Sequence, residues 1–95
     1  MQLELTGQNL KVTPSIRSLI NQKFTKLDRH MHRMIRAHLV FSVEKNMHQI
    51  NASIHMPGHD VFASSTSDDM YKTIDDVIAK LDKLLIKTKE KDFDA

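Results

Sequence analysis

The spacing of apolar residues changes repeatedly along this chain, and these changes restrict the folds it can adopt. In residues 16–27 the apolar side chains recur at steps of three and four, the period of a helix with one buried face. In residues 2–6, 37–44 and 50–56 they alternate with polar side chains, as in a half-buried strand, with Val40 as the exception. A long helical period returns at about 69–90. With Val61 and Ala63 marking a short fourth strand, the predicted order is β-α-β-β-β-α.

Polar residues and prolines mark where several of these elements begin and end. Thr13 and Pro14 predict the start of the first helix, with Thr13 as N-cap and proline in the first turn. Pro57-Gly58 predicts a turn between the third and fourth strands. Residues 91–95 are expected to form a frayed tail. The candidate N-caps of the last helix are Ser65, Ser67 and Asp68.

This order of elements predicts an α+β fold in a single domain spanning residues 1–95. A helix between the first two strands implies a parallel, right-handed crossover, and the remaining strands are expected to form an antiparallel meander. The result is a four-stranded mixed sheet with two helices packed on one face, an arrangement like that of double-stranded-RNA-binding domains. The other face of the sheet is left to polar residues and water.

The composition excludes several classes of protein. The chain has no cysteine, which excludes disulfides and thiolate metal sites. It has no signal peptide, so a cytoplasmic location is expected. No apolar run approaches the roughly 20 residues that a membrane-spanning helix needs. No cofactor motif is present, and we expect none to be bound.

The charges are unevenly distributed. Residues 11–36 carry seven basic side chains against one acid, a net charge of +6, whereas residues 69–95 carry six against seven. Four lysines of the last helix are predicted to lie in one stripe on its polar side, because Lys80, Lys83, Lys87 and Lys91 recur at helical spacing away from the apolar side. A solvated helix face explains this stripe taken alone. Together with the basic first helix, it favours a polyanionic partner.

We expect the two basic helices to lie side by side and to share a cationic groove. RNA is the expected anion, bound mainly through phosphates and sugars, because one tyrosine, four phenylalanines and no tryptophan offer little base stacking. The side chains predicted to face each other are Lys23, Lys26, Arg29 and Arg33 on one helix and Lys80, Lys83 and Lys87 on the other.

Other polar clusters point to structural roles. The spacings His30-x-His32 and His55-x-x-x-His59 permit metal binding, but neither pair has a third ligand nearby in sequence, so we interpret them as surface or half-buried histidines. Asp76 is placed to form helical ion pairs with Lys80 or Lys83. No acid, base and nucleophile set is visible, so the chain is not expected to be an enzyme.

Several short strings occur together in a familiar order. They are Gly7-Gln8-Asn9, Lys23-Phe24-Thr25-Lys26-Leu27, Val43-Glu44-Lys45, Asp69-Met70-Tyr71, Ile74-Asp75 and Lys80-Leu81. With these strings the chain closely resembles the bacterial ribosome hibernation-promoting factors, also called ribosome-associated inhibitors. The resemblance implies a protein that occupies the messenger and tRNA region of the small ribosomal subunit. It also implies inhibited translation and ribosome dimerisation in stationary phase or stress.

The resemblance also implies which residues bind ribosomal RNA. Carried over by position, they are Lys23, Lys26, Arg29, Lys80, Lys83 and Lys87, with Lys45 and Lys91 in addition. The chain length resembles the short form of the family, which works beside a separate ribosome modulation factor, and a free monomer is expected. The alternative is a protein-binding regulator, a modulator of an alternative sigma factor, that docks through the open sheet face.

Overall fold

The computed structural model describes the backbone of residues 2–30 and 34–94, and the side chains of residues 2–27 and 34–87. Its elements are β1 (Gln2–Gly7), α1 (Pro14–His30), β2 (Arg36–Glu44), β3 (Met47–Met56), β4 (His59–Ser67) and α2 (Met70–Asp94). The sheet has the order β1-β2-β3-β4. β1 pairs with β2 in parallel, and the other two pairings are antiparallel. The predicted order and the mixed sheet are therefore confirmed.

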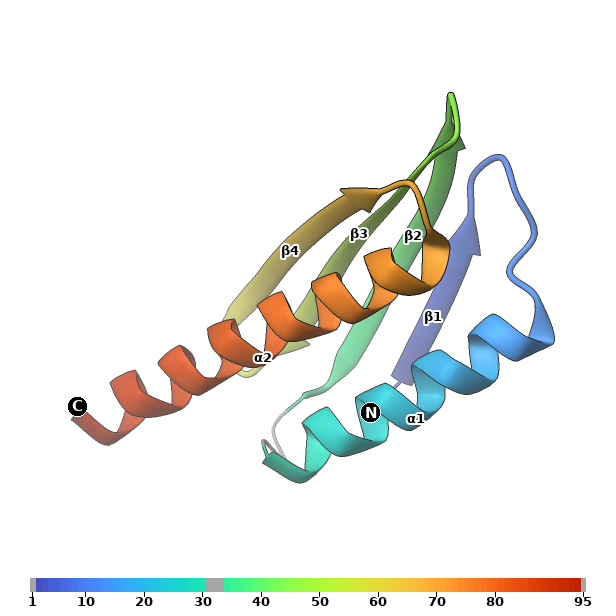
Figure 1. Cartoon of the computed structure of the whole chain (residues 1–95). Coiled ribbons are helices and arrows are strands. Elements are labelled where there is room, and N and C mark those ends of the chain that lie inside the picture. Colours follow the sequence, from blue (N-terminus) through green and yellow to red (C-terminus); the bar gives the residue numbers. More distant parts are fainter. Residues whose placement is uncertain (1, 31–33, 95) are drawn as a thin grey trace.

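Both helices cover the same face of the sheet (Figure 1). The core between the layers is built from the alternate positions of the strands and the apolar face of each helix, as the two periods predict. Phe24 of α1, Phe41 of β2 and Leu81 of α2 are completely buried in it. On the opposite, open face Phe62 is 66% exposed. No helix in the described part of the chain is long and apolar enough to cross a membrane.

Three boundaries differ from those expected. β3 begins at Met47 rather than near Ile50, and β4 is a full-length strand rather than a short one. The reason is pairing, because β4 stays in register with β3 from His59 opposite Met56 to Ser67 opposite His48. Backbone hydrogen bonds extend a strand whether or not its side chains alternate. The backbone of α2 continues to Asp94, through residues expected to be a frayed tail.

The start of α1 is confirmed, and the N-cap of α2 is corrected. Thr13 Oγ1 accepts a hydrogen bond from Ile16 N at 3.2 Å, and Pro14 is the first helical residue. At α2 the cap is Asp69 rather than any of the three predicted residues. Its Oδ1 accepts from Tyr71 N at 2.8 Å and from Lys72 N at 3.2 Å. Ser65 is unsuitable because it is buried and donates to Asp76 instead.

The loop after β1 is tied to the end of β2. The Asn9 side chain accepts from Val43 N at 3.0 Å and donates to Val43 O at 2.6 Å. Gly7 permits the bend, because a Cβ there would stand 2.0 Å from Leu10 O. The adjoining β2–β3 hairpin turns through Lys45 and Asn46, both with positive φ, which is the geometry of a tight hairpin turn.

Candidate nucleic-acid interface

The groove between α1 and α2 carries both signs of charge. It has a volume of about 290 Å³, with a floor of Leu27, Ile78 and Ala79. Lys23 and Lys26 line it from α1, and Asp75 and Asp82 line it from α2. Lys23 Nζ lies 2.8 Å from Asp75 Oδ1, so one of the two cations is already paired.

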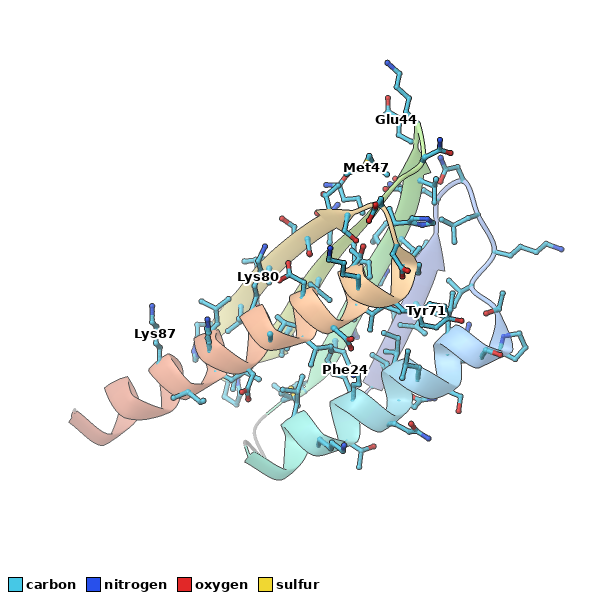
Figure 2. All side chains as sticks on the ribbon, in the orientation of Figure 1. Phe24, Glu44, Met47, Tyr71, Lys80 and Lys87 are labelled. Atoms are coloured by element: carbon cyan, nitrogen blue, oxygen red, sulfur yellow. The ribbon has the colours of Figure 1, made fainter. Side chains whose placement is uncertain are left out.

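The predicted cationic groove shared by both helices is therefore wrong. Lys80 lies on the other flank of α2, where its Nζ donates to Ser64 O of β4, and Figure 2 shows Lys80 and Lys87 on that side while Phe24 lies between the helices. The physical reason is the position of α2, which packs over β3 and β4. One flank of its apolar stripe then faces α1 and the opposite flank faces β4. Lys80 lies on the second flank, beside β4, and Asp75 and Asp82 line the first.

Lys80 is held by a polar cluster between α2 and β4. Its Nζ donates to the Ser64 carbonyl oxygen at 2.8 Å and lies 3.4 Å from Asp76 Oδ2. The predicted Asp76–Lys80 pair is thus confirmed. Asp76 also accepts a hydrogen bond from the hydroxyl of Ser65. That hydrogen bond, followed by the nearby charge of Lys80, holds the pKa of the Asp76 carboxyl below its usual value.

Beyond this cluster, α2 carries further exposed lysines. Lys83 and Lys87 are exposed, and among the side chains that the structure describes neither forms an ion pair. Lys72 is also exposed, one turn before Asp76. It was missed in the sequence, although its spacing of eleven residues from Lys83 places both on one line along a helix. We call Lys72, Lys80, Lys83 and Lys87 the α2 cationic edge.

The remaining predicted residues lie elsewhere. Lys45 is exposed in the β2–β3 hairpin, away from the α2 cationic edge. Arg29 and Lys91 belong to α1 and α2 by their backbones, but their side chains lie outside the described residues. Arg33, predicted to face the groove, also lies outside them.

The histidines make local contacts. His55 Nδ1 lies 2.6 Å from Asp60 Oδ1, and His38 Nε2 lies 2.9 Å from Thr6 Oγ1, both on the open face of the sheet. Within the described residues, no group of three or more metal-type side chains is close enough to hold an ion. His30 and His32 lie outside the described side chains.

Comparison with known proteins identifies the relatives of this arrangement. The family model described as "Sigma 54 modulation protein / S30EA ribosomal protein" matches residues 3–92. A ribosome hibernation promoting factor of Escherichia coli (strain K12) is 38% identical over 91 residues, covering 96% of each chain. One from Azotobacter vinelandii is 37% identical over 94 residues, covering 99% of this chain and 88% of the relative.

Solved structures agree with this comparison. A ribosomal subunit interface protein from Coxiella burnetii superposes with a TM-score of 0.90 at 31% identity, covering 95% of this chain and 99% of that one. The N-terminal domain of Thermus thermophilus Protein Y gives 0.85 at 26% identity, covering 93% and 99%. The family resemblance noted in the sequence is confirmed, and the chain belongs to the Sigma 54 modulation protein / S30EA ribosomal protein family.

Proposed function

We propose that this protein is a ribosome hibernation factor that binds the small ribosomal subunit and silences translation. The observation that carries the proposal is the α2 cationic edge, on which Lys83 and Lys87 are exposed and unpaired among the described side chains. Lysine ammonium groups bind phosphate as point charges, and a rigid row of them suits a folded RNA backbone. The names of the relatives, which refer to ribosome hibernation and to the ribosomal subunit interface, support the same partner.

The proposed mechanism is steric occlusion. A two-layer domain of this size, held by several lysine–phosphate contacts, fills the messenger and tRNA region of the small subunit. It thereby excludes the RNA that decoding requires. Ribosome dimerisation, cooperation with a separate modulation factor, a cytoplasmic location and a monomeric free state are parts of this proposal. The proposed role is binding and requires no catalysis.

The corrected geometry changes how the contacts are distributed. Lys83 and Lys87 are proposed as the principal phosphate ligands, with Lys72 beside them. Lys23 and Lys26 are proposed to make a separate contact from the mixed-charge groove. Arg29, Lys45 and Lys91 remain proposed ligands through the family resemblance. Docking of a sigma factor on the open sheet face receives less support: the family description names both roles, but the relatives from Escherichia coli, Azotobacter vinelandii and Coxiella burnetii are named for the ribosome.

The test is co-sedimentation with small subunits over a series of salt concentrations. The variant Lys83→Glu/Lys87→Glu should lose binding while keeping its fold, because exposed charges contribute only about 0–1 kcal/mol to stability. The matched control is Lys11→Glu/Arg17→Glu, which makes the same change in charge at exposed positions before and early in α1. Equal binding by both variants and the wild type would refute the proposed contact surface.

A further inference from the structure

A hollow of about 510 Å³ lies beside the β2–β3 hairpin, remote from the α2 cationic edge. This volume is within the roughly 300–1,000 Å³ range of small-molecule sites. Its wall combines side-chain amides, hydroxyls, two apolar side chains, one carboxylate and one cation. The lining residues that matter here are Gln8, Ser42, Glu44, Lys45, Met47 and Gln49.

The floor of the hollow is one cross-strand row of the open sheet face. Ser42, Gln49 and Thr66 lie directly opposite one another on β2, β3 and β4. Gln8 lies beside this row, since its N–H donates to Phe41 O at 2.9 Å and continues the pairing of β1 with β2. Three paired strands make this floor rigid.

The walls are also fixed before any ligand arrives. The two hydrogen bonds between Asn9 and Val43 hold the loop after β1 against β2. On the opposite side the hairpin carries Met47, which is 43% exposed, and Figure 2 shows Glu44 and Met47 together near its tip. A preformed hollow does not lose affinity to the ordering of its loops.

The chemistry of the wall matches a nucleobase. Glutamine amides supply both donors and acceptors, as the edge of a base requires, and a methionine side chain packs well against an aromatic plane. We propose that this hollow receives one unpaired base of an RNA strand. The amides of Gln8 and Gln49 meet the base edge, Met47 meets its plane, and Lys45 meets the phosphate.

Other ligands fit less well. A free anion would meet Glu44 as well as Lys45, so the net charge of these two residues is zero. An added peptide strand would need a free strand edge. Ser42 and Gln49 stand on β2 and β3, which are paired on both sides, and only Thr66 stands on the edge strand β4. Glu44 is the only carboxylate of the lining, too few for a metal ion.

This inference deepens the proposed function and rests on it, because the base would belong to RNA of the same ribosomal surface. The strand β4 lies between the hollow and the α2 cationic edge, with Thr66 lining the former and the Ser64 carbonyl bound by Lys80 beside the latter. The two sites therefore contact different RNA segments and can be inactivated separately.

The test is an NMR titration of the protein with the four ribonucleosides. Nucleosides carry no phosphate, so the lysines of α2 do not attract them. The side-chain amide signals of Gln8 and Gln49 and the methyl signal of Met47 should shift, and Gln49→Ala should weaken binding about 2- to 10-fold, the effect of one hydrogen bond. Ser53→Ala, elsewhere on the open face, should bind as the wild type does. If these signals do not move, or respond equally to ribose or inorganic phosphate, the proposal is wrong.

A second measurement separates this inference from the proposed function. In ribosome co-sedimentation, Gln49→Ala should weaken binding without changing its salt dependence, whereas Lys83→Glu/Lys87→Glu should reduce the salt dependence. If nucleosides bind but Lys83→Glu/Lys87→Glu still binds ribosomes normally, the α2 contact surface fails and the base pocket stands. If the lysine variant loses ribosome binding and nucleosides do not bind, the base pocket fails and the α2 contact surface stands.

Discussion

Lys23 Nζ lies 2.8 Å from Asp75 Oδ1 where α1 and α2 meet, so the groove between the two helices is bridged by an ion pair. The charge of a lysine expected to attract RNA is thereby partly neutralised by the neighbouring helix. This ion pair reduces the positive charge that the groove offers to an anion. Lys83 and Lys87, by contrast, are exposed and form no ion pair among the described side chains.

Asp75→Asn is expected to strengthen binding to small subunits. The change removes a carboxylate and frees Lys23 for phosphate, which should make the salt dependence steeper by roughly 0.7–0.9 in log–log slope. Stability should change by no more than about 1 kcal/mol, because Asp75 is largely exposed. Co-sedimentation at several salt concentrations measures both effects. Glu4→Gln, which removes an exposed carboxylate from the sheet's other face, is the control, and an equal gain there would indicate a general charge effect.

The prediction of a cationic groove shared by α1 and α2 was wrong for a geometric reason. Helical spacing shows that Lys80, Lys83 and Lys87 avoid the apolar face, but a helix has two polar flanks beside that face. Only the position of α2 over β3 and β4 decides which flank faces α1. Helical spacing predicts ion pairs within one helix, such as Asp76–Lys80, but not the pair that Asp75 forms across the groove with Lys23.

Other features were predictable because they depend on local chemistry alone. Thr13 and Pro14 define the start of α1 through capping and a missing N–H, and Phe24 and Leu81 are buried as the helical period predicts. The extent of β4 was not predictable. Its polar residues have no apolar alternation, and its length comes from register with β3.

Asp76 should make the stability of the domain depend on pH in the acidic range. Its pKa lies below the ordinary value of 3.8 in the folded protein, mainly because Ser65 donates a hydrogen bond and Lys80 lies nearby. The unfolded chain binds this proton more readily. The contribution of the ionised Asp76 carboxyl to stability is therefore fully present above the ordinary pKa, and it is lost as the pH falls through the lower pKa of the folded protein.

Urea unfolding of the wild type and Asp76→Asn between pH 3 and 7 measures this contribution. The difference in free energy of unfolding should be constant near neutral pH and should narrow once the pH falls below about 4, near the ordinary carboxyl value. In Ser65→Ala the carboxyl signal of Asp76 should titrate at higher pH than in the wild type. An unchanged Asp76 titration in Ser65→Ala would contradict the assignment of the hydroxyl as the main cause.

Asn9→Ala should loosen the attachment of the β1–α1 loop to β2. Removal of the amide leaves both Val43 N and Val43 O without the partner they have in the structure. The free energy of unfolding should fall by about 1–3 kcal/mol. Chemical denaturation measures this loss, with Gln22→Ala at an exposed position of α1 as the control. A loss no larger than that of the control would show that this clamp does not stabilise the domain.

The lysines of the α2 cationic edge should not contribute equally to RNA binding. Lys80 already donates to Ser64 O and pairs with Asp76, and an RNA phosphate must compete with both partners. Lys83 has no ion-pair partner among the described side chains and can bind phosphate directly. Lys83→Ala should therefore lower the salt slope of ribosome binding by roughly 0.7–0.9, the value of one phosphate contact, and Lys80→Ala by less.

Stability should follow the opposite order. Lys80→Ala removes the hydrogen bond to the Ser64 carbonyl oxygen of β4 and the ion pair with Asp76. The free energy of unfolding of this variant should therefore fall by up to about 1 kcal/mol. Lys83→Ala should leave it unchanged within error, because the side chain is exposed. Salt-dependent co-sedimentation and urea unfolding on the same two variants test both orders together. Equal salt slopes and equal free energies of unfolding for the two variants would show that the contacts of Lys80 with Ser64 O and Asp76 neither hinder phosphate binding nor stabilise the domain.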